Sequence, residues 1–485
     1  MSTFISGLSA AQFSALTTTQ VQALTTADYK ALSTAQINAM TSEQIAAIET
    51  QDLVVLNASQ IKAFDATRFS DGMLSYDIGV LTAKQVSALS TEQVSGLASG
   101  SIQALSSDQA KALTAAQLSA MSSDQIGALD TEDVAVLSAS QLKGLSTDNV
   151  VALTGDQLNA LSAKQVAALS TDQVKAIETA DLAALGSAQL AALTATQMKA
   201  LSTEQLGALG TDQIQQFNAR QVAALTTEQV STLSSDNIKA LTSDQTKALT
   251  AAQLNAMSSD QIGALDTGDV AALTAPQIKG LTADSVKAFT TAQAAALMYS
   301  QIAALTSTQV QAFETDDLQA IGTAQLGALT AAQVQQLSTE QINALSTEQV
   351  ASLLPKQIAA LKAEQITGMS TDNVQALTSA QMVAMTTAQI GGLTSAQIGV
   401  LGTEDLVGLS QAQMGAFSTA AIAELSTEQL GALTAKQISG LTTDQIQNGL
   451  STEQLGSLSS DQVRMLSATQ VAAMSDEQVQ SLTFG

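Results

Sequence analysis

One eight-residue unit repeats along the chain, and this repeat limits what the chain can fold into. A large apolar residue returns every eight positions from Leu8 to Leu482, giving sixty anchors with single-residue insertions near residues 71–72 and 448–449. The consensus is L-[ST]-[ST]-x-Q-[VIL]-x-A, and we number its positions 1 to 8 from the leucine. Units this short bury apolar surface only by stacking on their neighbours. We therefore predict a single continuous octapeptide-repeat solenoid over residues 1–485.

Each octad carries the signals of a helix start. Ser or Thr at position 2 with Gln at position 5 forms a capping box, and the apolar residues at positions 1 and 6 form a hydrophobic staple. The pattern predicts an all-α repeat solenoid of short capped helices, one per octapeptide, and three octads per coil is one arrangement it allows. The alternative is a β-solenoid with coils of about 24 residues. Ala, Gln, Leu and Glu are poor strand formers, which favours helices.

The anchor residues are expected to form a thin aliphatic core, because only 2% of residues are aromatic and there is no Trp. Phenylalanines near the two termini are candidate end-contact residues. The predicted core anchors include Leu16, Leu24, Leu241, Leu441 and Leu482, and the candidate end contacts are Phe4, Phe13 and Phe484.

Composition excludes several classes of function. The chain has no cysteine and no histidine, which removes disulfides, thiol chemistry, histidine bases and nearly all transition-metal sites. A formal net charge of −25 repels phosphate, so nucleic acid is not an expected partner. The sequence predicts no membrane span, no small-molecule substrate, no cofactor, no metal site and no catalytic residues. We expect a protein that is not an enzyme.

The position 5 column is the most conspicuous polar feature. Its glutamines are interpreted as caps that also form amide ladders between stacked units. Aspartate replaces glutamine in several octads and is interpreted as a charged group doing the same capping. A surface cation site at Glu404–Asp405 or Asp316–Asp317 is the alternative. The aspartates in question are Asp52, Asp133, Asp181, Asp269, Asp317 and Asp405.

The stretch L-T-T-x-Q-V-x-A-L resembles the long low-complexity arrays of bacterial secreted, surface and biofilm-matrix proteins. The resemblance covers nearly all of the chain and implies a solenoid filament outside the cell. The opening residues MSTFISGLSAAQF contain neither the basic nor the apolar segment of a Sec signal peptide. The sequence therefore suggests an extracellular or cell-surface protein exported by another route.

The first and last octads differ little from the consensus, so each end is expected to resemble an interior slice. Matching, uncapped ends make head-to-tail contacts that need not close. We predict a structural protein that assembles end to end with copies of itself into an extracellular filament or biofilm-matrix fibre. A monomeric surface stalk or adhesin spacer is the alternative, and an ice-binding surface of paired Ser and Thr hydroxyls is a third.

Overall fold

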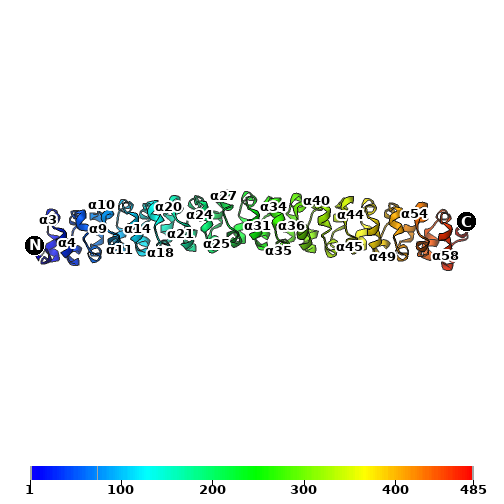
Figure 1. Ribbon diagram of the computed structural model, residues 1–485, viewed down its shortest axis with the longest axis horizontal. Coiled ribbons are helices and arrows are strands. Elements are labelled where there is room, and N and C mark those ends of the chain that lie inside the picture. Colours follow the sequence, from blue (N-terminus) through cyan, green and yellow to red (C-terminus); the bar gives the residue numbers. More distant parts are fainter. Residues whose placement is uncertain (1–2, 74, 483–485) are drawn as a thin grey trace. The chain divides into compact units, whose positions relative to one another are not determined.

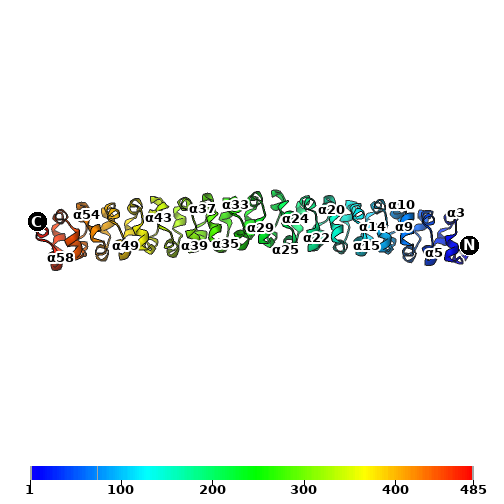
Figure 2. The same ribbon diagram turned by 180° about the vertical axis from the view of Figure 1, so that it is seen from behind.

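The chain forms two compact units, Met1–Leu241 and Thr242–Gly485. The computed structural model describes residues 3–73 and 75–482. In each unit, short helices follow one another through brief corners (Figures 1 and 2). The described residues contain helices and no strands, so the all-α repeat solenoid is confirmed and the β-solenoid is not supported. None of the described helices is long and apolar enough to cross a membrane.

Each octad contributes one short helix, and the α-helices share their starting position in the repeat. After α1 (Thr3–Ser6), the α-helices from α2 (Ala10–Ser14) to α59 (Asp476–Ser481) each begin at position 3 of their octad. They end at position 6, 7 or 8, except α9 (Ala66–Gly72), which runs one residue further. The octad of Leu441 forms a π-helix, η1 (Gln445–Gly449). Helices this short are unstable alone, so their stability must come from packing.

The predicted capping box forms in most octads and sets where each helix begins. In α26 (Thr203–Gly207), the N-cap Ser202 has extended φ and ψ of −71° and 159°. Its hydroxyl accepts a hydrogen bond from the Gln205 amide at 3.0 Å, and the Ser202 amide donates to Gln205 Oε1 at 2.9 Å. Two of the amides that a helix start leaves without partners are thereby satisfied.

Helices pack against the third helix along the chain, so three octads, or 24 residues, make one coil. In the first unit α11 (Ala83–Ala88) lies against α14 (Ser107–Ala112). In the second unit α37 (Thr291–Ala296) lies against α40 (Thr315–Ala320), and α45 (Pro355–Ala360) lies against α48 (Ser379–Ala384). Positions 1, 5 and 6 face inward, which leaves a core only a few side chains wide.

The predicted anchors lie in this core, but those of the first coil are less buried than the others. Leu241, Leu441 and Leu482 are buried, whereas Leu16 and Leu24 are only half-buried. Interior anchors are covered by the coil before them as well as by the coil after them. Leu16 and Leu24 belong to the first coil, so one of these two covers is missing.

Both insertions lie at a buried glycine. The first lengthens α9, where a Cβ on Gly72 would come within 2.6 Å of the Ser42 carbonyl oxygen in α6 (Ser42–Ala46). The second lies in η1, where a Cβ on Gly449 would come within 3.1 Å of the Thr419 carbonyl oxygen. The extra residue therefore fits because the backbone of the neighbouring coil approaches closely. Coil-to-coil pairing continues past each insertion with its sequence spacing increased by one residue.

Candidate functional site: the position 5 column

The position 5 glutamine joins two helices from successive coils. While Gln205 Oε1 caps its own helix, Gln205 Nε2 donates to the carbonyls of Val174 at 3.1 Å and Ile177 at 2.7 Å. These carbonyls lie at the end of α22 (Thr171–Ala176), where helical carbonyls have fewer backbone partners. The Val174 carbonyl also accepts from the Ile177 amide at 3.3 Å. One buried side chain therefore completes the start of one helix and the end of another, one coil earlier.

The same pair of bonds recurs along both units at sequence separations of 28 and 31 residues. In the second unit, Gln389 Nε2 donates to the Ile358 and Leu361 carbonyls, both at 2.7 Å. The expected amide ladders, in which glutamine side chains bond one another, do not form. The glutamines donate instead to backbone carbonyls of the preceding coil. Capping, the other part of the interpretation, is confirmed. The hydroxyls at position 2 take part in these caps, whereas those at position 3 do not.

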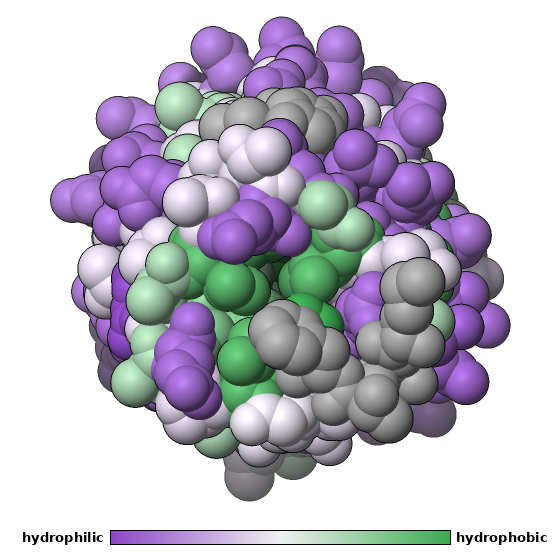
Figure 3. All heavy atoms as spheres, turned by 90° about the vertical axis from the view of Figure 1, so that its left-hand side faces the viewer, coloured by the Kyte–Doolittle hydropathy of each residue, from purple (hydrophilic) through white to green (hydrophobic). Residues whose placement is uncertain are grey.

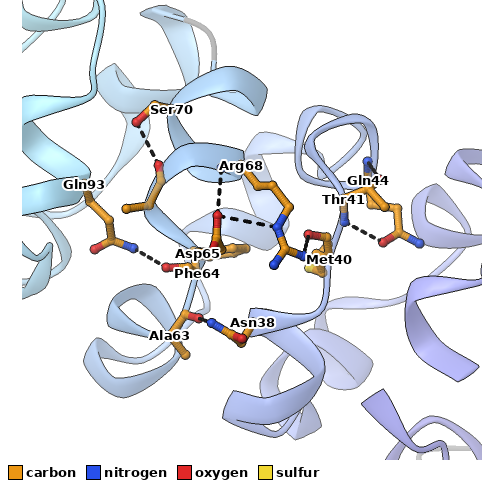
Figure 4. Close-up of polar contacts among 11 residues, drawn as sticks. Asn38, Met40, Thr41, Gln44, Ala63, Phe64, Asp65, Arg68, Ser70 and Gln93 are labelled. Atoms are coloured by element: carbon orange, nitrogen blue, oxygen red, sulfur yellow. Dashed lines mark hydrogen bonds and ion pairs between the residues drawn. The ribbon is translucent and has the colours of Figure 1, made fainter. Parts of the chain in front are cut away.

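Other donors at position 5 preserve the link between coils. Arg68 replaces glutamine and donates from Nη1 to the Met40 carbonyl at 2.9 Å (Figure 4). The N-cap Asp65 holds this arginine by an ion pair of 3.4 Å. The shorter Asn149 also reaches, donating from Nδ2 to the Met121 carbonyl at 2.9 Å. Several residue types at position 5 thus supply a donor at the coil interface, although Ala421, buried at the same position, shows that a donor is not required in every octad.

Aspartate at position 5 supplies no such donor when it is ionised. Asp405 accepts from the Gly402 amide at 3.1 Å and therefore caps, as interpreted from the sequence. Asp52, Asp133 and Asp269 each keep one buried oxygen with no hydrogen-bond partner among the described residues, so the interpretation is wrong for that oxygen. Burial is the largest cause of the raised pKa in all four carboxyls.

The alternative of a surface cation site would combine one exposed and one buried acid in each pair, since Glu404 and Asp316 are exposed. Asp405 and Asp317 are both buried. Nowhere in the described ranges do three or more Asp, Glu, His or Cys side chains group closely enough to hold a metal ion. Asp181 is half-buried, and its octad has an acid at position 2, Glu178, as the octad of Asp317 does.

The three phenylalanines predicted at the ends have different positions. Phe13 is fully buried inside its unit, with an exposed fraction of 0%, and is therefore a core residue and not an end-contact residue. Phe4 lies in α1, but its side chain is outside the described part of the structure. Phe484 also lies outside the described residues.

The first coil presents polar residues that sequence reasoning missed. Gln12 and Gln20 cap their own helices, as interior glutamines do, but their side chains are exposed. The third octad of this coil has Asp28, which accepts from the Thr25 amide at 3.0 Å and from its hydroxyl at 2.6 Å. These bonds lower the pKa of Asp28, the hydroxyl contributing most. The sequence shows that Gln12, Gln20 and Asp28 occupy position 5 of their octads. It does not show in which direction the side-chain amide of a glutamine points.

Serines opposite the buried aspartates were also missed. The Ser107 hydroxyl donates to Asp133 Oδ1 at 2.9 Å, and the Ser243 hydroxyl donates to Asp269 Oδ1 at 2.7 Å. Both partners of the second pair lie 136 residues after those of the first. The signal in the sequence was that a serine and an aspartate recur together at the same spacing.

Comparison with known proteins identifies the repeat. A family model described as the ALTTAQ repeat matches more than half of the chain. The matched residues are 21–47, 126–163, 174–211, 205–235, 235–267, 262–298, 310–347, 318–355, 350–387, 379–411, 407–443 and 448–484. No curated protein matches the chain.

Two solved structures align with the chain at 11% identity. One is the leucine-rich repeat-containing protein LegL7 from Legionella pneumophila, with a TM-score of 0.14, covering 55% of this chain and 79% of that one. The other is the structure of APUM23 with GGAAUUGACGG, with a TM-score of 0.16 and 90% coverage of each chain. No property of either protein is transferred to this chain.

Proposed function

Because this chain belongs to the ALTTAQ repeat family, we propose that it is a structural protein whose copies assemble end to end into an extracellular filament or matrix fibre. The interior of each unit supplies the template for such a contact. Within each unit, an interior coil binds the coil before it through anchor side chains and through glutamine amides that bond backbone carbonyls. A first coil and a last coil carry the two halves of the same interface.

The observation that carries the proposal is the exposed half-interface of the first coil. Gln12 and Gln20 are exposed where interior glutamines are buried, and the anchors Leu8, Leu16 and Leu24 are only half-buried. Figure 3 shows hydrophobic residues at the centre of this face with hydrophilic residues around them. An apolar patch with a polar rim is typical of protein–protein contacts.

The last coil supplies acceptors in matching positions. By the spacing of the repeat, the carbonyls of Leu458 and Leu466 are those that glutamines of a following coil would bond. Gln462 and Gln470 of this coil bond backward in the usual way, to Leu433 and Leu441 at 2.7 Å. A net charge of −25 opposes side-by-side contact of copies more than a small end contact, and salt weakens that opposition.

Asp28 is the residue at which the end interface departs from the interior one. As an ionised carboxylate it cannot donate to a carbonyl, so one of the three columns would lack its bond. This makes Asp28→Gln an informative variant, because it completes the donor set of the first coil. Asp28 is only half-buried, so the change leaves the core untouched.

The test is filament length measured by electron microscopy at matched protein concentration. We expect the natural chain to form filaments, Asp28→Gln to lengthen them, and the double variant Gln12→Glu with Gln20→Glu to abolish them. The control is Gln22→Glu, which adds the same charge per site at an exposed position outside the column. A strictly monomeric chain at high concentration, or filaments indifferent to Gln12 and Gln20, would favour a monomeric stalk instead.

A further inference from the structure

Among the described residues, the buried aspartates Asp52, Asp133 and Asp269 each keep one side-chain oxygen that receives no hydrogen bond. Asp133 lies in α17 (Thr131–Ala135) and Asp269 lies in α34 (Thr267–Ala272). A buried carboxylate with an oxygen that accepts no bond is costly when ionised, because burial removes the water that would hydrate it. The stability of these positions therefore depends on whether the carboxyl carries a proton.

The carboxyl of Asp133 lies where position 5 normally supplies a donor. Its Oδ1 accepts from the Ser107 hydroxyl of α14 at 2.9 Å. By the spacing of the repeat, the carbonyl that its other oxygen would meet is that of Leu105, 28 residues earlier. Two octads further along, Asn149 Nδ2 donates to the equivalent carbonyl, that of Met121, at 2.9 Å. Aspartic acid has the length of asparagine, and its protonated form carries one O–H donor, so it can make the same bond.

The second unit repeats this arrangement at Asp269. Its Oδ1 accepts from the Ser243 hydroxyl at 2.7 Å, and its Oδ2 has no partner in the described ranges. An asparagine again shows what a donor does at this position, since Asn373 Nδ2 donates to the Ile342 carbonyl at 3.2 Å. Each unit thus contains a buried carboxyl with one oxygen that accepts a bond and one that is placed to donate.

Asp405 provides a natural contrast, because both of its oxygens accept. The Ser379 hydroxyl donates to Oδ1 and the Gly402 amide donates to Oδ2, both at 3.1 Å. An ionised carboxylate fits this position, whereas a donor in place of Oδ2 would leave the Gly402 amide without its acceptor. Replacement by asparagine should therefore have opposite effects at Asp133 and at Asp405.

The charges that act on the two carboxyls are negative. For Asp133, burial is the largest cause of the raised pKa, a hydroxyl bond opposes it, and Asp130 and Glu132 add to it. The same kinds of cause act at Asp269, with Asp266 as the added charge. Among the helices packed against α17 and α34, α37 has no charged side chain. The others carry Asp108 and Lys111 on α14, Asp156 on α20 (Gly155–Ala160), and Asp244 and Lys247 on α31 (Ser243–Ala248). Both lysines are exposed, and neither forms an ion pair within the described part of the chain.

We propose that Asp133 and Asp269 are pH-sensitive links between coils, closed by a proton and loosened when the proton is lost. In the closed form, Asp133 Oδ2–H donates to the Leu105 carbonyl while Oδ1 accepts from Ser107. In the open form the proton has passed to solvent, the carboxylate oxygen faces a carbonyl oxygen, and α17 loosens from α14. Asp269 links α34 to α31 in the corresponding way. The proposal does not depend on end-to-end assembly.

The direction of the pH dependence follows from the position of the proton. The pKa of each carboxyl is raised above its ordinary value of 3.8 in the folded chain. The contribution of each link to stability is therefore fully present below the unfolded pKa and is lost as pH rises through the folded pKa. The chain should be held most tightly at these two links in acid.

The test is hydrogen exchange of the full chain at about pH 7.5 and about pH 4.5, corrected for intrinsic rates. We expect Asp133→Asn to slow exchange of α17 by about tenfold at the higher pH, because asparagine keeps its donor at every pH. The difference should shrink at the lower pH, where the natural carboxyl is protonated. Asp269→Asn should act alike on α34. Asparagine fits position 5, since Asn149, Asn237 and Asn373 are buried there.

The matched control is Asp405→Asn, which removes the same charge from a carboxylate with two accepting oxygens. Exchange of α51 (Thr403–Val407) should become faster in this variant at the higher pH. Slower exchange in both variants would show that removal of negative charge alone stabilises the coils, and would overturn the proposal. An effect of Asp133→Asn that is equal at the two pH values, or no effect, would overturn it as well.

Discussion

A glutamine side chain suits position 5 because its amide carries an acceptor and a donor on a flexible stem. At Gln205 the acceptor serves the amide of Ser202 and the donor serves carbonyls of the preceding coil. A leucine of similar size would remove the side-chain partner of the Ser202 amide and of the Ile177 carbonyl, at a cost of about 1–3 kcal/mol for each group that is left unpaired and buried. Aspartates at this position keep the acceptor and lose the donor, so their protonation affects stability.

Asp317 provides a test of that dependence on pH. Burial is the main reason that its pKa is raised, the Thr291 hydroxyl opposes the shift, and Glu314 and Asp316 add to it. Because the folded pKa exceeds the unfolded one, the contribution of Asp317 is fully present below the unfolded pKa. It is lost as pH rises through the folded pKa.

We therefore expect the natural chain to lose local stability relative to Asp317→Asn as pH rises from about 4. Hydrogen exchange of α40, measured across pH on both proteins and corrected for intrinsic rates, checks this. A stability difference that stays constant with pH would show that Asp317 does not titrate on folding.

The sequence was sufficient for one half of each glutamine's role. The capping box follows from local spacing, and Ser202 with Gln205 could be paired without a structure. The bond to the preceding coil joins residues 28 to 31 apart, and its acceptor is a backbone carbonyl that every residue type carries. No side-chain pattern marks such an acceptor, so the bare oxygens of Asp133 and Asp269 could not be inferred either.

At the scale of the helix, the two insertions show how a unit of fixed length absorbs one more residue. In α9 the helix continues to Gly72 before the chain turns. In η1 the extra residue widens the helix into a π-turn. The positions of both insertions could be read from the break in the eight-residue spacing. Their different forms depend on neighbouring backbone, which the repeat pattern does not contain.

Gly72→Ala should destabilise the packing of α9 on α6. The new Cβ would lie 2.6 Å from the Ser42 carbonyl oxygen and 2.9 Å from Ile45 Cβ, and neither atom can move without shifting backbone. We expect a cost of about 1–3 kcal/mol, typical of overpacking.

Gly207→Ala is the matched control, because a Cβ there meets nothing within 4 Å. It should stabilise α26 by about 0.5–1 kcal/mol, since alanine loses less backbone entropy in a helix. Hydrogen exchange of α9 and α26 measures both changes. Equal effects at the two glycines would contradict the close approach at Gly72.

At the scale of a whole unit, each interior helix is held by the coils before and after it. Contacts between helices join each one to the third along, and the hydrogen bonds of position 5 follow the same rule. Stability in such a chain is close to a sum of unit and nearest-neighbour contributions. A local defect should therefore remain local.

Leu441→Asp tests this in the second unit. Leu441 is buried, and an unpaired carboxylate there should cost at least about 3 kcal/mol in the coils that contact it. Hydrogen exchange should accelerate over residues 410–480 and stay unchanged over residues 290–350. The control Val383→Asp adds the same charge at an exposed side chain and should change little. Loss of protection throughout the unit would indicate a cooperative core instead.

The three helices of a coil are interchangeable, and this has a consequence for how the gene can change. Ser379 and Asp405 lie 136 residues, or seventeen octads, after Ser243 and Asp269, and seventeen is not a multiple of three. The later pair therefore occupies a different column of the stack, yet the serine–aspartate bond is the same. Replication slippage by any whole number of octads thus yields a foldable chain, so length should vary among natural alleles in steps of a single octad.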